Sequence, residues 1–196
     1  MIIAKVGEQM NTFKMQAVQV HGYGGADTLM LEVVERPQPQ AGEVLVRILS
    51  AAVIPLDWKI RNGWLKNVFP ITFPYIPGTA VSGIVESVGE GVRAFQAGHR
   101  VFGSVRGAYA EYGIAAVQEL VAMPDAISFE DAATIRAGAD TAWKALFTEG
   151  ELEAGQKVLI HAAAGGVGQF AVQLAKRKGA IVIATASKGN LEFIKS

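Results

Sequence analysis

The sequence contains no cysteine. Disulfide bonds, thiolate metal ligands and a cysteine nucleophile are therefore excluded. The sequence also has no excess of one charge, because 18 Lys and Arg residues balance 18 Asp and Glu residues. Proteins bind nucleic acids and anionic membranes through clustered positive charge, and no dense run of Lys or Arg is present here. We therefore expect neither nucleic acid nor a membrane as a partner.

No apolar run approaches the ~20 residues that are needed to cross a bilayer. The first residues also lack the apolar core and the small-residue cleavage site of a signal peptide, so we expect a cytoplasmic protein. Hydrophobic residues make up 51% of the chain, and 22 residues are glycine. This composition predicts a packed globular fold rather than disorder.

The first part of the chain has the pattern of a β-rich domain. We predict an N-terminal extension at residues 1–14 and a first strand at 16–20. From there to residue 125, short strand-like segments alternate with Gly- and Pro-containing turns; residues 43–49, for example, alternate polar and apolar side chains. Many short strands with such turns are typical of a barrel or a sandwich, and we assign residues 15–125 to it.

The pattern changes near residue 128, and we assign residues 126–196 to a second domain. Ser128 followed by acidic residues is typical of a helix N-terminus, and we expect two helices between residues 129 and 149. Arg136 and Asp140 fall inside this stretch. Because a buried charge is costly when unpaired, we expect these two side chains to pair at i, i+4.

The end of the chain has a strand–turn–helix–strand pattern. We predict an apolar strand at residues 157–161 and a second strand at residues 180–185. The second strand is so apolar that we expect a parallel sheet covered on both faces. The helix between them places apolar residues at i, i+3, i+4, i+7 and i+8, which predicts one buried face made of Val167, Phe170, Ala171, Leu174 and Ala175.

A glycine motif, Gly166-x-Gly168-x-x-Ala171, lies between the first of these strands and the helix. Gly166 permits the tight turn, Gly168 allows the backbone to approach a pyrophosphate, and Ala171 keeps the helix close to the strand. The pyrophosphate is then expected at the helix N-terminus, where free N–H groups favour an anion. The alternative is a glycine-rich turn that serves packing alone.

The end of the second strand predicts which cofactor is bound. NAD-binding proteins carry Asp or Glu about 20 residues after the first glycine, where it binds the ribose 2′-hydroxyl. Residues 186–189 contain no carboxylate, and Ser187 and Lys188 can donate to a 2′-phosphate instead. The sequence therefore favours NADP(H), although Lys188 at a helix start also fits an ordinary solvated residue.

Together, these motifs resemble those of quinone oxidoreductases, which belong to the zinc-free branch of the medium-chain dehydrogenase/reductase superfamily. The resemblance covers the chain from about residue 15 to its end. It rests on residues 57–61, 77–85, 92–103, 107–112, 141–143, 161–168 and 171–176.

The resemblance implies an α/β plus β architecture, in which a GroES-like β-barrel is followed by a Rossmann domain. It implies an oxidoreductase that transfers a hydride from NADPH to a quinone or an α,β-unsaturated carbonyl. The implied cofactor-binding residues are Thr141, Gly165, Gly166, Val167, Gly168, Ser187 and Lys188.

No metal site is expected, because zinc-dependent relatives carry Cys at the position of Ile54 and His-Glu at residues 79–80. The oxyanion must then be stabilised by hydrogen-bond donors. By position, Lys59 is the candidate, with Asp57 orienting its loop or pairing with a nearby base. The alternative is a solvent-facing Lys59 beside a structural Asp57.

The resemblance also implies that the chain supplies only the first two strands of a Rossmann sheet, so we expect it to be truncated within that domain. Ile54 departs from the family pattern, where Asn is usual.

Two hypotheses about function follow from this resemblance and its departures. The chain is an oxidoreductase, or part of one, completed by a C-terminal segment or by another copy in a homo-oligomer. Alternatively, it is a non-catalytic remnant or a nucleotide-binding module.

Overall fold

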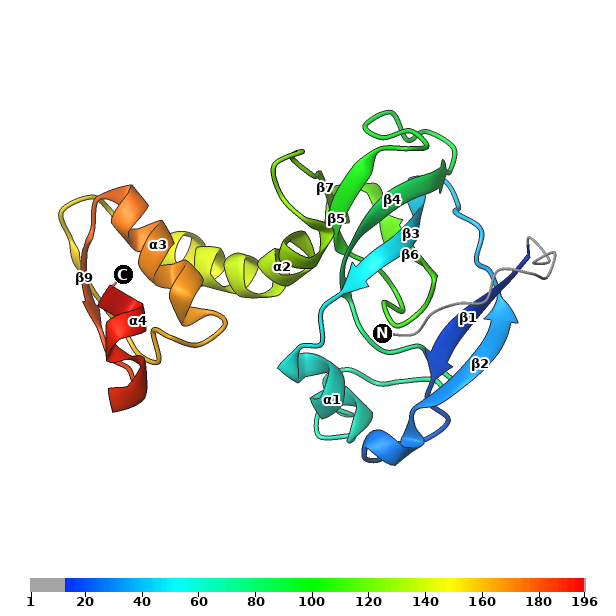
Figure 1. Ribbon diagram of the computed structural model, residues 1–196, viewed down its shortest axis with the longest axis horizontal. Helices are drawn as coiled ribbons and strands as arrows, with labels where there is room; N and C mark the ends of the chain where they lie inside the picture. Colours follow the sequence, from blue (N-terminus) through cyan, green and yellow to red (C-terminus); the bar gives the residue numbers. More distant parts are fainter. Residues whose placement is uncertain (1–12, 196) are drawn as a thin grey trace. The chain divides into compact units, whose positions relative to one another are not determined.

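The computed structural model describes residues 13–195 and divides the chain into two compact units, between Ala133 and Thr134 (Figure 1). The units are considered separately below. The first strand begins at Lys14, two residues earlier than predicted, and residues 1–12 of the predicted extension lie outside the described part. The predicted boundary at residues 125 and 126 precedes α2 (Phe129–Trp143), whereas the division of the structure falls inside this helix.

The first unit consists mainly of antiparallel strands. A five-stranded sheet has the order β6-β3-β4-β5-β7, and β1 and β2 form a separate hairpin that is joined to the rest by single bridges. This arrangement confirms the predicted β-rich domain. Its elements are β1 (Lys14–Gln19), η1 (Ala26–Thr28), β2 (Met30–Glu35), β3 (Glu43–Ala51), α1 (Pro55–Arg61), β4 (Ala80–Val88), β5 (Arg100–Ser104), β6 (Tyr112–Ala116), η2 (Val117–Glu119) and β7 (Leu120–Ala122).

Small β-branched residues fill the core of this unit, as expected where strands pack closely. Glycine is required where β3 and β4 meet, because a Cβ on Gly83 would lie 2.1 Å from the carbonyl oxygen of Arg47. The buried cluster consists of Val44, Val46, Val81, Val85, Val101, Val105, Ala108, Ala115 and Leu120.

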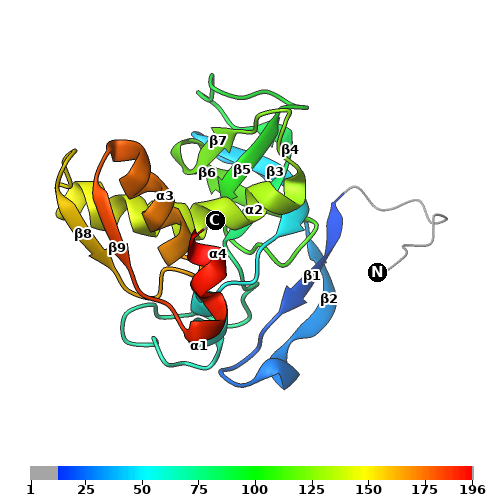
Figure 2. The ribbon, with the colours of Figure 1, turned by 60° about the vertical axis from the view of Figure 1, so that its left-hand side comes forward.

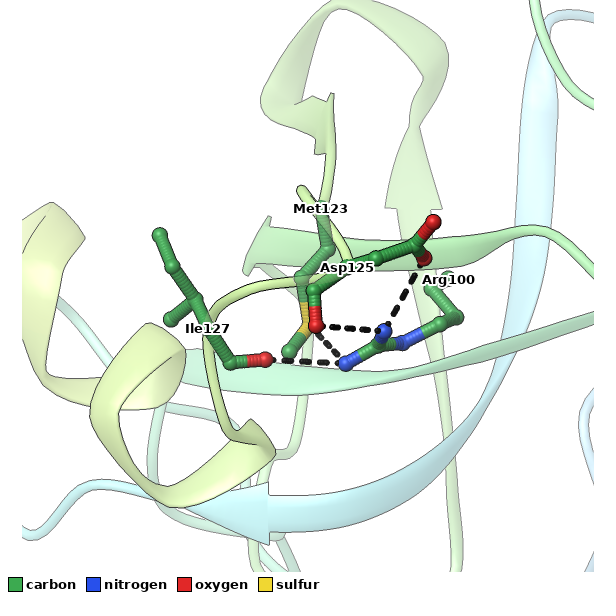
Figure 3. Close-up of polar contacts among 4 residues, drawn as sticks. All are labelled: Arg100, Met123, Asp125 and Ile127. Atoms are coloured by element: carbon green, nitrogen blue, oxygen red, sulfur yellow. Dashed lines mark hydrogen bonds and ion pairs between the residues drawn. The ribbon is translucent and has the colours of Figure 1, made fainter.

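Arg100 of β5 fixes the loop that leads into α2 (Figure 3). Its guanidinium donates to the Asp125 carboxylate at 3.1 Å and to the carbonyl oxygen of Ile127 at 2.9 Å, and it lies 4.8 Å from the ring centroid of Phe129. The Ser82 hydroxyl of β4 donates to the Phe129 carbonyl. These contacts attach the first turn of α2 to strands β4 and β5.

The helix after residue 128 begins as predicted, because Ser128 Oγ accepts the Asp131 N–H at 3.0 Å. The prediction of two helices is wrong. Trp143 keeps right-handed helical backbone angles, so α2 continues without interruption into the π-helical segment η3 (Lys144–Glu149). The predicted pair is confirmed, since Arg136 Nε donates to the Asp140 carboxylate at 2.7 Å.

The second unit contains a strand–helix–strand motif with parallel strands, as Figure 2 shows. Helix α3 packs against both strands. This confirms the predicted Rossmann-type arrangement. Its elements after η3 are β8 (Lys157–Ile160), α3 (Gly168–Lys178), β9 (Ile181–Ala184), η4 (Lys188–Asn190) and α4 (Leu191–Lys195). The buried cluster consists of Ala142, Leu146, Leu152, Ile160, Ala163, Ala171 and Ala175.

The predicted buried face of α3 is correct except at its first member. Ala171 and Ala175 are buried, and Phe170 and Leu174 are half-buried. Val167 is 40% exposed because it is the N-cap residue and precedes the first helical turn.

The prediction that both faces of the parallel sheet are covered is wrong for the described residues. Helices of this unit cover the face that carries Ile160 and Val182. On the opposite face, Leu159, Ile181 and Ile183 are 55%, 52% and 51% exposed. Apolar side chains therefore occupy both faces of the sheet, but only one face is covered within residues 134–195.

Candidate functional site

The glycine turn links the end of β8 to the start of α3. Ala162 adopts a left-handed backbone (φ 52°), which is unusual for a residue with a Cβ. The turn is closed by the Gly165 N–H, which donates to the Ala162 carbonyl at 2.9 Å. It is tied to β9 through the Ala163 N–H, which donates to the Thr185 carbonyl at 2.9 Å. The turn therefore has a defined position at the carboxyl ends of both strands.

The roles predicted for Gly166 and Gly168 are exchanged in the structure. A Cβ on Gly168 would lie 2.3 Å from the Ala162 carbonyl oxygen, so the turn itself requires this glycine, with or without a ligand. A Cβ on Gly166 would meet nothing within 4 Å, so the open backbone surface lies there. Gly138 of α2 contacts the turn closely, since its Cβ would lie 2.3 Å from the Gly166 carbonyl oxygen. Sequence reasoning missed Gly138, although a glycine in a helix interior indicates a close approach.

A cavity of about 450 Å³ adjoins this turn within the second unit. It brings together three of the predicted cofactor-binding residues: Gly165, Val167 and Gly168. His161 lines the same cavity. Thr141, also predicted, does not line it, and its hydroxyl donates to the Ala137 carbonyl one helical turn earlier at 2.8 Å.

The remaining predicted cofactor residues follow β9. Ser187 occupies the N-cap position of η4, and its hydroxyl accepts from the Asn190 side-chain amide at 3.1 Å. Lys188 is exposed and has no ion-pair partner among the described residues. Its ammonium group is thus available to a ligand at the carboxyl end of the strand.

Asp57, a predicted catalytic residue, is 6% exposed and caps α1. Its Oδ2 accepts the Ile54 N–H and the Tyr109 hydroxyl, both at 2.9 Å. Burial raises the pKa of the Asp57 carboxyl, and the two hydrogen bonds act in the opposite direction. Burial and the bond to Asp57 raise the pKa of the Tyr109 hydroxyl. Asp57 therefore fixes α1 to the segment that carries Tyr109, a partner that sequence reasoning missed.

Lys59, the other predicted catalytic residue, lies on the same helix but forms no ion pair with Asp57 in the described structure. Its Nζ lies 5.7 Å from the ring centroid of Trp58. Trp58 in turn contacts the exposed Trp64 edge to face, with ring centroids 5.0 Å apart. An ammonium group and two indole rings therefore lie together on α1 and the segment after it.

The described part of the chain offers neither a cluster of metal ligands nor a membrane-spanning helix. Within residues 13–195, no three His, Asp or Glu side chains lie close enough together to hold a metal ion. None of the helices in the same range has the length and apolar character to span a membrane.

Comparison with known proteins agrees with this arrangement. Residues 40–125 match the alcohol dehydrogenase GroES-like domain. A chloroplastic quinone-oxidoreductase homologue from Spinacia oleracea is 40% identical over an alignment of 191 residues, and the match covers 92% of this chain and 58% of the relative. The quinone oxidoreductase of Rattus norvegicus is 38% identical over an alignment of 175 residues, and the match covers 88% of this chain and 53% of the relative. The chain spans about half the length of the curated relatives it matches.

Solved structures give the same result. The quinone oxidoreductase from Coxiella burnetii has a TM-score of 0.82 at 36% identity, covering 93% of this chain and 59% of that structure. A mycobacterial protein solved in complex with NADPH has a TM-score of 0.82 at 33% identity, covering 92% of this chain and 55% of that structure.

A GroES-like domain followed by a Rossmann-type strand–helix–strand motif is the arrangement of the medium-chain dehydrogenase/reductase fold. Over the residues that it contains, the chain is similar to the quinone oxidoreductases of this superfamily. The predicted fold and the predicted resemblance are thereby confirmed.

Proposed function

We propose that this chain is the substrate-binding and phosphate-binding part of an NADPH-dependent oxidoreductase that acts on quinones or α,β-unsaturated carbonyls. The observation that carries the proposal is the open backbone surface at Gly166, at the carboxyl end of β8. The names of the relatives, and the NADPH complex of the mycobacterial protein, support the same reaction.

The residues of the second unit fit NADP(H). The N–H groups at the start of α3 suit the pyrophosphate, and no Cβ obstructs its approach at Gly166. Ser187 and Lys188 suit the 2′-phosphate, because no carboxylate in residues 185–190 repels it. When bound, the cofactor supplies the hydride, and the protein supplies binding and orientation.

In the first unit, we assign the substrate to Lys59 and the two indole rings of Trp58 and Trp64. A quinone is a flat, electron-poor ring, and electron-rich indole faces bind such rings by stacking. The Lys59 ammonium stabilises the oxyanion that develops when hydride reaches the ring, a task that zinc performs in other members. Asp57 contributes by capping α1, which carries both Lys59 and Trp58.

The test is NADPH oxidation by the purified chain with a simple quinone, followed by absorbance. We expect Lys59→Ala to lower kcat/KM by about 100-fold, as is typical for the loss of one oxyanion donor. Lys66→Ala is the matched control, because Lys66 is exposed nearby on the segment after α1 and should change the rate less than about twofold. Equal rates for the Lys59 variant and the wild type would remove Lys59 from the proposal.

A second candidate function is a nucleotide-binding module without catalysis. It is favoured by the Asp57 carboxylate, which is occupied by two structural hydrogen bonds and is not paired with Lys59. Saturable NADPH binding without NADPH oxidation in the presence of a quinone would support this candidate over the first.

We also propose that more polypeptide covers the sheet face formed by Leu159, Ile181 and Ile183, either a C-terminal segment or another copy of the chain. These exposed apolar residues favour such a partner. A cytoplasmic location and the absence of zinc stay predictions.

A further inference from the structure

His161 and Thr185 connect the carboxyl ends of the two parallel strands. His161 directly follows β8, and Thr185 directly follows β9. The His161 Nδ1 lies 3.0 Å from the Thr185 hydroxyl oxygen. The Thr185 backbone strengthens the connection, because its N–H donates to Ile160 at 3.0 Å and its carbonyl accepts from Ala163 at 2.9 Å.

The backbone around His161 is unusually constrained. Ala162, the next residue, has φ 52°, a conformation that persists only where the surroundings enforce it. The bonds from Ile160 and Ala163 to Thr185 flank it on both sides. The imidazole is therefore held in a fixed position beside the end of β9, although it lies on the exposed surface of the unit.

One ring nitrogen of His161 is left for a ligand. A threonine hydroxyl can donate to Nδ1, which places the proton of the neutral ring on Nε2. Among the described residues, Nε2 has no hydrogen-bond partner. Ser187 and Lys188 follow Thr185 within three residues. A hydroxyl donor and an ammonium group therefore lie in the segment directly after β9.

We infer that His161 is a specificity-determining residue for NADP(H), donating its Nε2–H to the 2′-phosphate, and that Thr185 orients it. The inference rests on the proposed function. In Rossmann folds the adenosine ribose lies at the end of the second strand, where NAD-binding proteins place an acidic residue on its 2′-hydroxyl. The contact with Thr185 places the His161 ring beside the end of the second strand, β9. The pyrophosphate, by contrast, is expected at the glycine turn and the N-terminus of α3.

The experiment measures binding of two nucleotide fragments, 2′,5′-ADP and 5′-AMP, to the purified chain by calorimetry. These probes differ in the 2′-phosphate and carry no nicotinamide, so activity is not needed. We expect His161→Ala to weaken 2′,5′-ADP binding about tenfold, as the loss of one charge-assisted hydrogen bond predicts, with less than a twofold effect on 5′-AMP.

Thr185 provides a matched pair of variants that tests the orienting role without removing the ring. Thr185→Val keeps the side-chain shape but loses the hydroxyl, and should weaken 2′,5′-ADP binding about threefold. Thr185→Ser keeps the hydroxyl and should bind like the wild type. The thermal transition of each variant checks that it is folded.

The outcomes separate this inference from the proposed function. Equal weakening of both probes by His161→Ala, or unchanged binding of 2′,5′-ADP, would overturn the inference while leaving the proposed function intact. If neither probe binds to the folded wild-type chain, the proposed NADP(H) site itself is wrong.

Discussion

The two units of this chain differ in how completely their own residues bury their apolar surface. In the first unit, Val44, Val46 and Val101 are fully buried in a cluster formed by the five-stranded sheet. In the second unit, two parallel strands leave Ile181 and Ile183 about half exposed. The first unit therefore has the core of an independent domain. The second has an ordered phosphate-binding turn on a sheet that leaves apolar surface for other polypeptide.

The largest expected effect tests the core of the first unit. In Gly83→Ala, the new Cβ would lie 2.1 Å from the backbone oxygen of Arg47, so β3 and β4 must separate. We expect a loss of about 3 kcal/mol in the free energy of unfolding. Denaturant unfolding measures it by tryptophan fluorescence in a Trp143→Phe background, since the remaining tryptophans, Trp58 and Trp64, lie in the first unit.

The matched control is Gly22→Ala, because a Cβ there meets nothing within 4 Å. It should change stability by less than about 0.5 kcal/mol. Similar stability for both alanine variants would contradict the close packing of β3 against β4.

The next effect concerns the hydrogen bond that fixes α1. Tyr109→Phe removes the donor to the buried Asp57 carboxylate, and we expect a loss of about 2 kcal/mol at neutral pH. Tyr112→Phe is the control, because the Tyr112 ring packs under Arg36 and its hydroxyl has no hydrogen-bond partner among the described residues. Urea unfolding of both variants gives the comparison.

The same site predicts a pH dependence. Because burial raises the pKa of Asp57 in the folded state, the proton that Asp57 binds stabilises the folded state. This stabilisation is fully present below the ordinary pKa of 3.8 and is lost as the pH rises through the pKa of the folded state. Tyr109→Phe removes a hydrogen bond that lowers the folded-state pKa, so in this variant the loss of stability with rising pH should continue to a higher pH. Asp57→Asn should abolish this titration. The measurement is the free energy of unfolding against pH for the wild type and the Asp57→Asn variant, and identical profiles would rule out a buried carboxyl that ionises.

A smaller effect is expected at the loop before α2. Arg100→Lys retains the charge but loses the two-pronged contact with Asp125 and Ile127, which should cost about 1 kcal/mol. Hydrogen exchange in the first turn of α2 should become faster. Arg93→Lys is the control, since Arg93 is exposed and its side chain forms no ion pair in the described structure. Unchanged exchange in the Arg100 variant would mean that this side chain does not hold the loop.

The smallest effect is expected on the uncovered sheet face. The double change Ile181→Thr and Ile183→Thr should alter the stability of this chain by less than about 0.5 kcal/mol per site, because both side chains are half exposed and threonine retains strand propensity. Val101→Thr in the first core should cost more, because it buries an unpaired hydroxyl. A large loss from the double change would indicate that copies of the chain already cover this face in solution.

Local patterns in the sequence predicted most of the fold. The capping Ser128 and the Arg136–Asp140 pair depend on residues a few positions apart, and the structure has both as expected. The glycine motif lies in the predicted turn, but the roles predicted for Gly166 and Gly168 are exchanged, because the clash that a Cβ would cause depends on how the turn folds back onto Ala162. The prediction of two helices failed because the end of α2 is not marked by a helix-breaking residue, so the chain continues into a π-helical segment.

Features that depend on distant residues were not predictable. The bond from Tyr109 to Asp57 joins residues 52 positions apart, and that from His161 to Thr185 joins residues 24 positions apart. The exposed sheet face was missed because a run of apolar residues indicates that a strand is suited to burial, and does not show which elements cover it. The roles of Lys59 and Lys188 stay predictions, since neither side chain has a structural partner that reveals its function.

The most direct measurement is a fluorescence titration of the purified chain with NADPH and, separately, with NADH. We expect saturable binding that favours NADPH, and Lys188→Ala should weaken NADPH binding about tenfold while leaving NADH binding nearly unchanged. A cooperatively folded chain that binds neither nucleotide would contradict the proposed site, because an open glycine turn at the end of β8 would then not suffice to hold a dinucleotide.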